Sequence, residues 1–282
     1  MIRFQNQLFA GCNAEYSKAR YVIFGVPYDG TTTFRSGTRN GPRSIREMSY
    51  NFETYLPSYD LDLTELPIID LGDIDITVTP EDVVTQVQEA TQDIVRDTKI
   101  PVMLGGEHSI TIGSVRAVKP DCYIVCDAHL DLREEFRGTI YNHGCTTRRV
   151  YDEGIKDIII IGARSGTKDQ FEFARSLRLF TADEIKKHGL ANVLSKVKGL
   201  IKGKRVYLSI DADVIDCCLT PGLGTPEPFG LTPWDISDII GVVAPQSIAF
   251  DYVEVSPFDS GQTATVASQM VREFIAAHWK GT

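Results

Sequence analysis

The sequence Cys126-Asp127-Ala128-His129-Leu130-Asp131 carries three metal-ligand side chains at alternate positions. It continues the apolar run 122–125, and an apolar, β-branched run of this length is typical of a buried strand. Residues two apart on an extended chain point to the same face. We therefore expect Asp127, His129 and Asp131 to converge at the carboxyl end of this strand, where open α/β sheets bind their ligands.

Seven other runs resemble this strand, and most alternate with helical patterns. The predicted strands are 21–25, 67–73, 100–104, 122–126, 156–162, 178–180, 205–210 and 248–253. Helices are predicted to begin near Pro42 and Thr232 and to span 79–97, 145–153 and 262–278, with Thr79 as an N-cap. Strands alternating with helices predict an α/β fold, with one domain over residues 1–282 and helices on both faces of a parallel sheet.

Composition narrows the classes of partner. The chain has 282 residues, 43% of them hydrophobic, and a formal net charge of −9. This charge argues against nucleic acid or an anionic membrane as a partner and is compatible with a cationic substrate. The six cysteines form no CxxC pair, which indicates reduced thiols and a cytoplasmic protein. The N-terminal segment 1–6 lacks an apolar signal region, and no stretch approaches the roughly 20 apolar residues of a membrane span.

Ligand-type side chains follow three of the predicted strands. They are His108, Asp127, His129, Asp131, Asp211 and Asp213. Four carboxylates in one site need cations to balance them, and two divalent ions fit better than one. Oxygen-rich ligation with a minority of imidazole favours Mn²⁺ over Zn²⁺. Two such ions can lower the pKa of a shared water, so the pattern indicates hydrolysis.

Six motifs carry a resemblance that covers nearly the whole chain in order. They are Gly-Gly-Glu-His-Ser at 105–109, Asp-Ala-His-Leu-Asp at 127–131, Asn-His-Gly at 142–144, Ser-Ile-Asp-Ala-Asp-Val at 209–214, Pro-Gly-Leu-Gly-Thr-Pro-Glu-Pro at 221–228 and Glu-Val-Ser-Pro at 254–257. Together they resemble the ureohydrolase family of arginases and agmatinases. The run at 224–228 and the pair Arg148-Arg149 are most similar to the agmatinase branch.

The resemblance implies a three-layer αβα fold around an eight-stranded parallel sheet, and a site with two Mn²⁺ ions per chain. By the family's pattern one ion is held by His108, Asp127, Asp131 and Asp211. The other is held by Asp127, His129, Asp211 and Asp213, so Asp127 and Asp211 bridge the ions. The family also implies a homo-oligomer, either a trimer or a hexamer.

The same resemblance implies roles in catalysis and substrate binding. Glu254 matches the carboxylate that binds a guanidinium group, and a planar fork of N–H donors pairs well with a carboxylate. His143 matches the histidine that carries a proton to the leaving amine. Asp131 is expected to accept a hydrogen bond from the attacking water as well. Thr225 and Arg164 are expected on the rim of the pocket as further substrate-binding residues.

Agmatine, hydrolysed to putrescine and urea, is the expected substrate. Arginine is disfavoured because the loop 132–137 lacks the neutral polar residues that hold an α-amino acid head group. Guanidinobutyrate, other guanidines and formiminoglutamate stay open, since Arg133, Arg137, Arg148 or Arg149 could meet a carboxylate. An inactive metal-binding regulatory protein is the alternative from another class. Phe229 and the pair Cys217-Cys218 depart from the family's common pattern, close to the predicted pocket mouth.

Overall fold

A parallel sheet of eight strands runs through the centre of the computed structural model, which describes residues 8–282. The strand order is β4-β1-β5-β10-β9-β6-β7-β8, and every adjacent pair is parallel. The strands are β1 Tyr21–Val26, β4 Ile68–Asp73, β5 Ile100–Gly105, β6 Cys122–Cys126, β7 Ile158–Ile161, β8 Arg178–Phe180, β9 Val206–Asp211 and β10 Ser247–Val253. All eight predicted strands are confirmed, with ends that differ by two residues or fewer.

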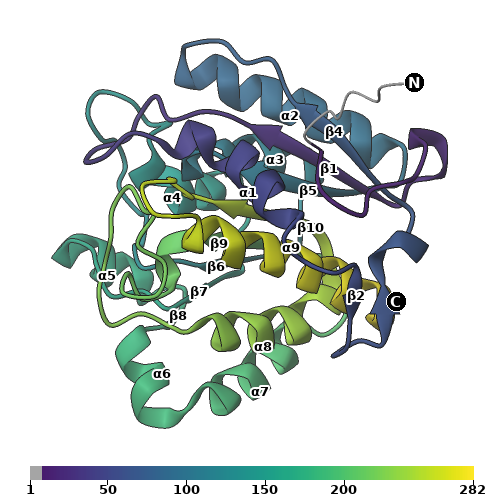
Figure 1. Cartoon of the computed structure of the whole chain (residues 1–282). Helices are drawn as coiled ribbons and strands as arrows, with labels where there is room; N and C mark the ends of the chain where they lie inside the picture. The colour runs from purple at the N-terminus through teal and green to yellow at the C-terminus, as the bar shows by residue number, and fades with distance from the viewer. Residues whose placement is uncertain (1–7) are drawn as a thin grey trace.

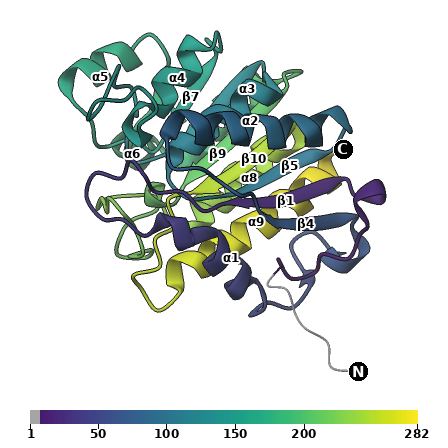
Figure 2. The same ribbon diagram turned by 90° about the horizontal axis from the view of Figure 1, so that it is seen from above.

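Helices cover both faces of the sheet, as Figures 1 and 2 show. The helices are α1 Gly41–Ser49, α2 Pro80–Arg96, α3 Thr111–Val118, α4 Thr146–Asp152, α5 Lys168–Ala174, α6 Ala182–His188, α7 Leu190–Ile201, α8 Pro233–Val243 and α9 Gln262–Gly281. Helices α2, α3, α4 and α5 pack on one face, and α1, α7, α8 and α9 pack on the other. The expected three-layer αβα architecture is therefore confirmed.

The alternation of side chains along the strands explains why both faces need cover. In β1, Tyr21 and Ile23 enter the apolar core beneath α9, while Val22 and Phe24 enter the core beneath α2. Every residue of β1 and β6 is buried. A strand buried on both faces reads as a continuous apolar run, and this continuity is the pattern on which the prediction rested.

The predicted helix starts are also confirmed. The Thr79 side chain accepts a hydrogen bond from the Asp82 N–H at the start of α2. Thr232 forms a reciprocal capping box with Asp235 at the start of α8. Pro42 lies in the first turn of α1, where its missing N–H costs no intrahelical hydrogen bond.

A few features lie outside the predictions. The chain between α1 and β4 forms a two-stranded antiparallel sheet from β2 Tyr55–Leu56 and β3 Leu61–Asp62. Within residues 8–282, no helix combines the length and apolar character that crossing a bilayer requires. The segment 1–6, predicted to lack a signal region, lies outside the described residues, and a single domain over 1–282 stays a prediction.

Candidate metal centre

The register of the sheet brings the ligand-bearing strand ends together. Strands β5, β10, β9 and β6 are neighbours in the middle of the sheet. Val253 of β10 pairs with Asp211 of β9, and Ile210 pairs with Cys126 of β6. Asp127 and Glu254, which follow Cys126 and Val253, therefore leave the sheet on either side of Asp211. The carboxyl ends of parallel strands share one edge, so these side chains meet without any large insertion.

Three carboxylates converge on one nitrogen of His108. Its Nδ1 lies 3.2 Å from Asp127 Oδ2, 3.4 Å from Asp131 Oδ2 and 3.2 Å from Asp211 Oδ2. His108 and Asp127 are almost completely buried. A ring nitrogen carries at most one proton, so it cannot satisfy three carboxylates by hydrogen bonding. Among the described residues, His108 Nδ1 and Asp127 Oδ2 have no hydrogen-bond partner.

The other nitrogen of His108 determines which nitrogen carries the proton. Its Nε2 lies 3.0 Å from Ser209 Oγ, and the Ser209 hydroxyl donates to Asp251 Oδ1 at 2.6 Å. Since that hydroxyl has one hydrogen, Ser209 Oγ accepts from Nε2–H of His108. Nδ1 is therefore the nitrogen that faces the three carboxylates and that can offer its lone pair to a bound cation. A lone pair among carboxylate oxygens is repulsive unless a cation lies between them.

A second group of ligands adjoins the first. His129 Nδ1 lies 2.9 Å from Asp213 Oδ2 and 3.7 Å from Asp127 Oδ1, and its Nε2 lies 3.6 Å from Glu227 Oε1. The ligand-type atoms of Asp127, His129 and Asp213 lie within 4.8 Å of one another, as do those of His108, Asp127 and Asp131. Asp127 belongs to both groups, which is the position expected of a bridging ligand. Asp211 joins the His108 group by its distances, and its bridging role stays a prediction.

The charges of the site require compensation. Burial raises the pKa of Asp131 to about 7, and the neighbouring Asp127 adds to the shift. Burial also raises the pKa of Asp127 and of Asp211. The pKa of Asp213 is instead held below its usual range, because His129 outweighs the effect of burial. Four carboxylates carry a charge of −4 when ionised, and two divalent cations would neutralise them. The donor set and the unpartnered atoms thus fit a pair of cations.

Glu254 and His143 lie beside these ligands. Glu254 Oε1 accepts a hydrogen bond from the His108 N–H at 2.8 Å and lies 3.5 Å from His143 Nδ1. Burial alone would lower the pKa of His143, but Glu254 and Asp131 raise it to about 9. His143 Nε2 is 3.1 Å from Thr33 Oγ1, in the loop that follows β1. The imidazole is thus held between a carboxylate and a hydroxyl at the wall of the site.

Two site residues have left-handed backbones, which alternation along a strand does not predict. Asp131 has φ of 49° and Glu254 has φ of 63°. Side chains other than glycine adopt this region at a cost, and such strain is common at functional sites. Asp213 also departs from an extended strand: it lies in a 3-10 turn, 212–214, where its N–H donates to Asp211 Oδ1. The ligands converge, but only Asp211 does so from within a strand.

A pocket of about 340 Å³ opens over the ligands. Its lining includes Asp131, Asp211, His129 and Glu254, which we call its floor, and Thr225 and His143. Arg133, Phe136 and Gln170 also line it. The Arg133 guanidinium carbon lies 4.3 Å from the centre of the Phe136 ring. The loop 132–137 therefore supplies both a cation and an aromatic side chain to the pocket.

Arg164 lies elsewhere than expected. Its five guanidinium N–H groups each have a backbone carbonyl as acceptor, and the acceptors are Gly162, Asp213, Val214, Glu227 and Pro228. No donor is left for a substrate, and Arg164 is absent from the pocket lining. The substrate contact of Arg164 thus stays a prediction that this geometry does not support. The residue ties the turn after Asp213 to the loop that carries Thr225.

Several residues of the site were not predicted. Glu107, fully buried, accepts hydrogen bonds from Thr31 N–H at 2.7 Å and from the hydroxyls of Thr31 and Ser109 at 2.5 Å. The Thr31 hydroxyl in turn accepts from the His143 N–H at 3.0 Å. Ser209 precedes Asp211 by two residues on a strand, so alternation alone could have identified it. Thr31 and Thr33 gave a weaker signal, as part of a Thr-rich loop after a strand.

Comparisons with known proteins agree with this geometry. Residues 19–277 match the model of the Arginase family. The chain is 41% identical to the N(1)-aminopropylagmatine ureohydrolase of Thermococcus kodakarensis, over 93% of this chain and 92% of that protein. It is 37% identical to a mitochondrial guanidino acid hydrolase of Homo sapiens, over 91% and 77%. The crystal structure of the agmatine ureohydrolase of Thermoplasma volcanium matches with a TM-score of 0.94 and 38% identity, over 98% and 96%.

Proposed function

Because this chain belongs to the arginase family, we propose that it hydrolyses agmatine to putrescine and urea with two Mn²⁺ ions bound at the centre. It is a hydrolase that acts on a C–N bond of a guanidino compound. The choice of agmatine and of manganese is the proposal. The observation that carries it is the cluster of His108, His129 and four aspartates beneath a pocket that also contains Glu254.

The residues that would hold the ions are those of the two groups described above. His108, Asp127, Asp131 and Asp211 would form one set, and Asp127, His129 and Asp213 would form the other, with Asp211 proposed as a second bridging ligand. Bound cations of this kind lower the pKa of water and so supply a nucleophile near neutral pH. Such a nucleophile is needed because a guanidinium carbon is deactivated by resonance and the group stays protonated.

The side chains around the floor bind and orient the substrate. Glu254 is buried and lines the pocket, so its carboxylate can pair with two N–H groups of the guanidinium and turn the central carbon toward the floor. Its Oε1 already accepts from the His108 N–H, which fixes the side chain. Asp131 accepts a hydrogen bond from the attacking water, and Thr225 adds a hydroxyl to the wall. These contacts hold the reacting atoms close together in one orientation.

His143 supplies the proton that the leaving amine takes up. Glu254 and Asp131 favour the protonated form of His143. Its Nδ1 lies 3.5 Å from Oε1 of Glu254, a residue of the pocket floor. A protonated imidazole can donate to the leaving amine, which must take a proton as the C–N bond breaks. Thr33 Oγ1 holds the other ring nitrogen. His143 is thus placed as a general acid.

The far end of the substrate decides among guanidino compounds. Agmatine ends in an ammonium and arginine in an α-amino acid group. The loop 132–137 has no neutral polar pair for that group, and a carboxylate left desolvated there would cost on the order of 10²-fold in kcat/KM. Names of two relatives support agmatine or its N(1)-aminopropyl derivative.

A guanidino acid is the second candidate, and Arg133 favours it. Of the four arginines that could meet a carboxylate, Arg133 is the one that lines the pocket within residues 8–282. Arg148 pairs instead with Glu134 and Asp152, and Arg137 donates to the Thr33 carbonyl. The human relative's name supports the same class.

Steady-state kinetics on the Mn²⁺-loaded protein separates the two candidates. Agmatine, guanidinobutyrate and arginine are compared for the unaltered chain and for Arg133→Gln. We expect agmatine to have the highest kcat/KM of the three compounds. Arg133→Gln should leave the kcat/KM for agmatine unchanged or raise it. If guanidinobutyrate is preferred and Arg133→Gln lowers its kcat/KM about 10- to 100-fold, the guanidino acid assignment replaces agmatine. Arg148→Gln, which removes a guanidinium outside the pocket, is the control.

We also propose a reducing, cytoplasmic location and a homo-oligomer, trimer or hexamer. All six cysteines are free thiols, which supports the location. Trp234 is 80% exposed, and a large apolar side chain at the surface supports a subunit contact. Size measurement by light scattering tests the assembly.

A further inference from the structure

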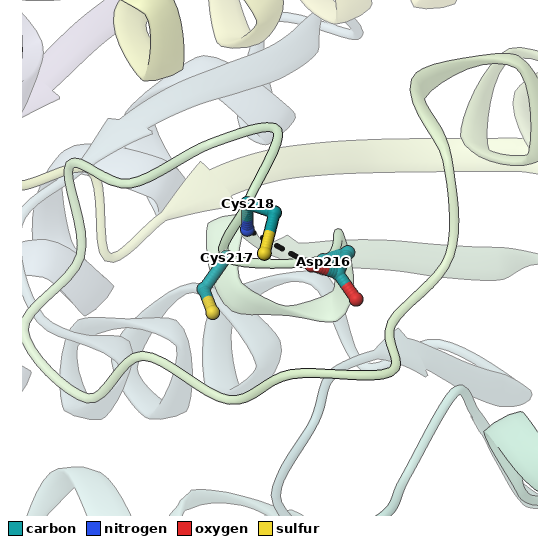
Figure 3. Close-up of side chains that lie close together, drawn as sticks. All are labelled: Asp216, Cys217 and Cys218. Atoms are coloured by element: carbon teal, nitrogen blue, oxygen red, sulfur yellow. Dashed lines mark hydrogen bonds between the residues drawn. The ribbon is translucent and has the colours of Figure 1, made fainter.

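A cluster of two thiols and a carboxylate lies apart from the residues that the reaction uses. Asp216, Cys217 and Cys218 form a turn after β9 and its 3-10 extension. Figure 3 shows their side chains gathered at this turn. One ligand-type atom from each lies within 4.8 Å of the other two. Sulfur donors distinguish this cluster from the oxygen-rich centre in the pocket.

The carboxylate of the cluster is already held in place. Asp216 Oδ1 accepts from the Cys218 N–H at 2.9 Å, and Oδ2 accepts from the Gly230 N–H at 3.0 Å. The Cys218 N–H, followed by the Gly230 N–H, lowers the pKa of Asp216, so it is an anion at neutral pH. No ion pair compensates this charge within the part of the chain that the structure describes. Each carboxylate oxygen keeps a lone pair for a further partner.

The thiols differ in exposure, and each suits a role in a metal site. Cys218 is exposed, so an ion can reach it from solvent, whereas Cys217 is half-buried against the apolar core. The Cys217 N–H donates to the Glu227 carbonyl at 3.3 Å, which fixes the backbone of the turn. In a tetrahedral site with Zn–S bonds near 2.3 Å, two sulfurs lie about 3.8 Å apart. The ligand atoms therefore need to move by only about 1 Å.

We propose that Asp216, Cys217 and Cys218 form a binding site for a thiophilic divalent cation of the Zn²⁺ or Cd²⁺ class. Two thiolates and one carboxylate supply three of four tetrahedral positions, and water takes the fourth. Mn²⁺ prefers oxygen ligands, so this site and the carboxylate-rich centre select different ions. Each thiol gives up its proton when the ion binds.

The location ties this site to the pocket. Asp216 accepts a hydrogen bond from the Gly230 N–H, and the Cys217 N–H donates to the Glu227 carbonyl. Gly230 and Glu227 both belong to the loop that carries Thr225. The Glu227 side chain faces His129. An ion at the cluster would therefore be bound at the base of the loop that forms one wall of the pocket.

Cadmium titration of the Mn²⁺-loaded protein tests the site, since Cd–thiolate bonds give an ultraviolet charge-transfer band that carboxylates and imidazoles do not. We expect the band to saturate at one equivalent and to be displaced by Zn²⁺. Cys218→Ser, which alters an exposed side chain, should halve the band, and the double variant Cys217→Ser/Cys218→Ser should abolish it. Asp216→Asn should keep the band and weaken the affinity.

Controls separate this result from damage to the fold. Cys12→Ser removes another partly exposed thiol and should leave the titration unchanged. Each variant should retain the Mn²⁺ content and the melting temperature of the unaltered protein. A band that survives in the double variant, or that saturates only at a large excess of Cd²⁺, would overturn the proposal.

Discussion

Replacing Ser209 with alanine should weaken the binding of one metal ion selectively. Ser209 is not among the residues that line the pocket, and its hydroxyl lies between His108 Nε2 and Asp251 Oδ1. It accepts from the imidazole and donates to the carboxylate, which makes His108 Nδ1 the nitrogen that can ligate an ion beside Asp127, Asp131 and Asp211. Alanine removes both hydrogen bonds and frees the ring to turn or to take the other tautomer.

The size of the effect follows from these contacts. Loss of a partner that orients a ligating histidine typically costs about 10- to 100-fold in metal affinity. That range equals about 1.4 to 2.8 kcal/mol. The Asp251 carboxylate keeps the hydroxyl donors of Tyr207 at 2.6 Å and Thr111 at 2.8 Å, so one buried oxygen alone loses its donor. His129 has its own partners, Asp213 and Glu227, and the ion near it should bind almost as before.

Calorimetric titration of the metal-free protein with Mn²⁺ measures the two affinities. We expect one binding step to weaken by the stated factor and the other to change by less than about threefold. Ser268→Ala is the matched control, because Ser268 is also fully buried and its hydroxyl has no hydrogen-bond partner among residues 8–282. Equal weakening of both steps, or no weakening of either, would refute the argument from tautomer and orientation.

Three further predictions concern other parts of the chain. His143→Ala should keep both ions, by metal analysis, and lose about 10²- to 10⁴-fold in turnover, whereas loss of an ion would make His143 a ligand. Burial lowers the pKa of His278, which lies beside the Tyr21 hydroxyl, to about 4. As the pH falls below 6.5, this histidine therefore becomes protonated in the unfolded chain before it does so in the folded protein. The free energy of unfolding should fall by about 3 kcal/mol as the pH approaches 4. Urea unfolding measures the free energy of unfolding at pH 7 and at pH 5. Its decrease between these pH values should be about 2 kcal/mol smaller for His278→Gln than for the unaltered protein, and equal decreases would show that His278 is not responsible. Phe229 has φ of 64° and is 85% exposed, so Phe229→Gly should raise the free energy of unfolding by about 0.5 to 1 kcal/mol, and a lower melting temperature would show that the ring packs on something.

The sheet was readable from the sequence because its strands are buried on both faces. Runs such as Ile158–Ile161 contain no polar residue, and such a continuous apolar run is typical of a strand buried on both faces. The metal-ligand residues at the ends of β6 and β9 indicate which edge of the sheet is functional. Phe229 was identified as a departure from the family's common pattern, and the structure gives it a positive φ, a conformation that favours glycine.

Interactions between distant segments could not be read in this way. Arg164 looked like a rim residue, but whether its donors meet substrate or carbonyls depends on how the loop 221–230 folds back. The left-handed backbones of Asp131 and Glu254 arise from the turns that follow their strands, and neither residue type signals them. The hydrogen-bonded chain runs from His108, in the 3-10 turn after β5, through Ser209 of β9 to Asp251 of β10, and these segments are neighbours only in the folded sheet.

The position of the ligand-bearing strands has a consequence for how bound ions exchange with solvent. Strands β5, β10, β9 and β6 occupy the middle of the sheet, while β4 and β8 lie at its edges. Central amides exchange their hydrogens through global unfolding, whereas edges and loops open locally at lower cost. The floor of the centre therefore belongs to the slowest-exchanging part of the molecule, and the loops that carry His143 and Thr225 provide the faster motions. Ions should enter and leave by movement of these loops while the strands beneath stay protected.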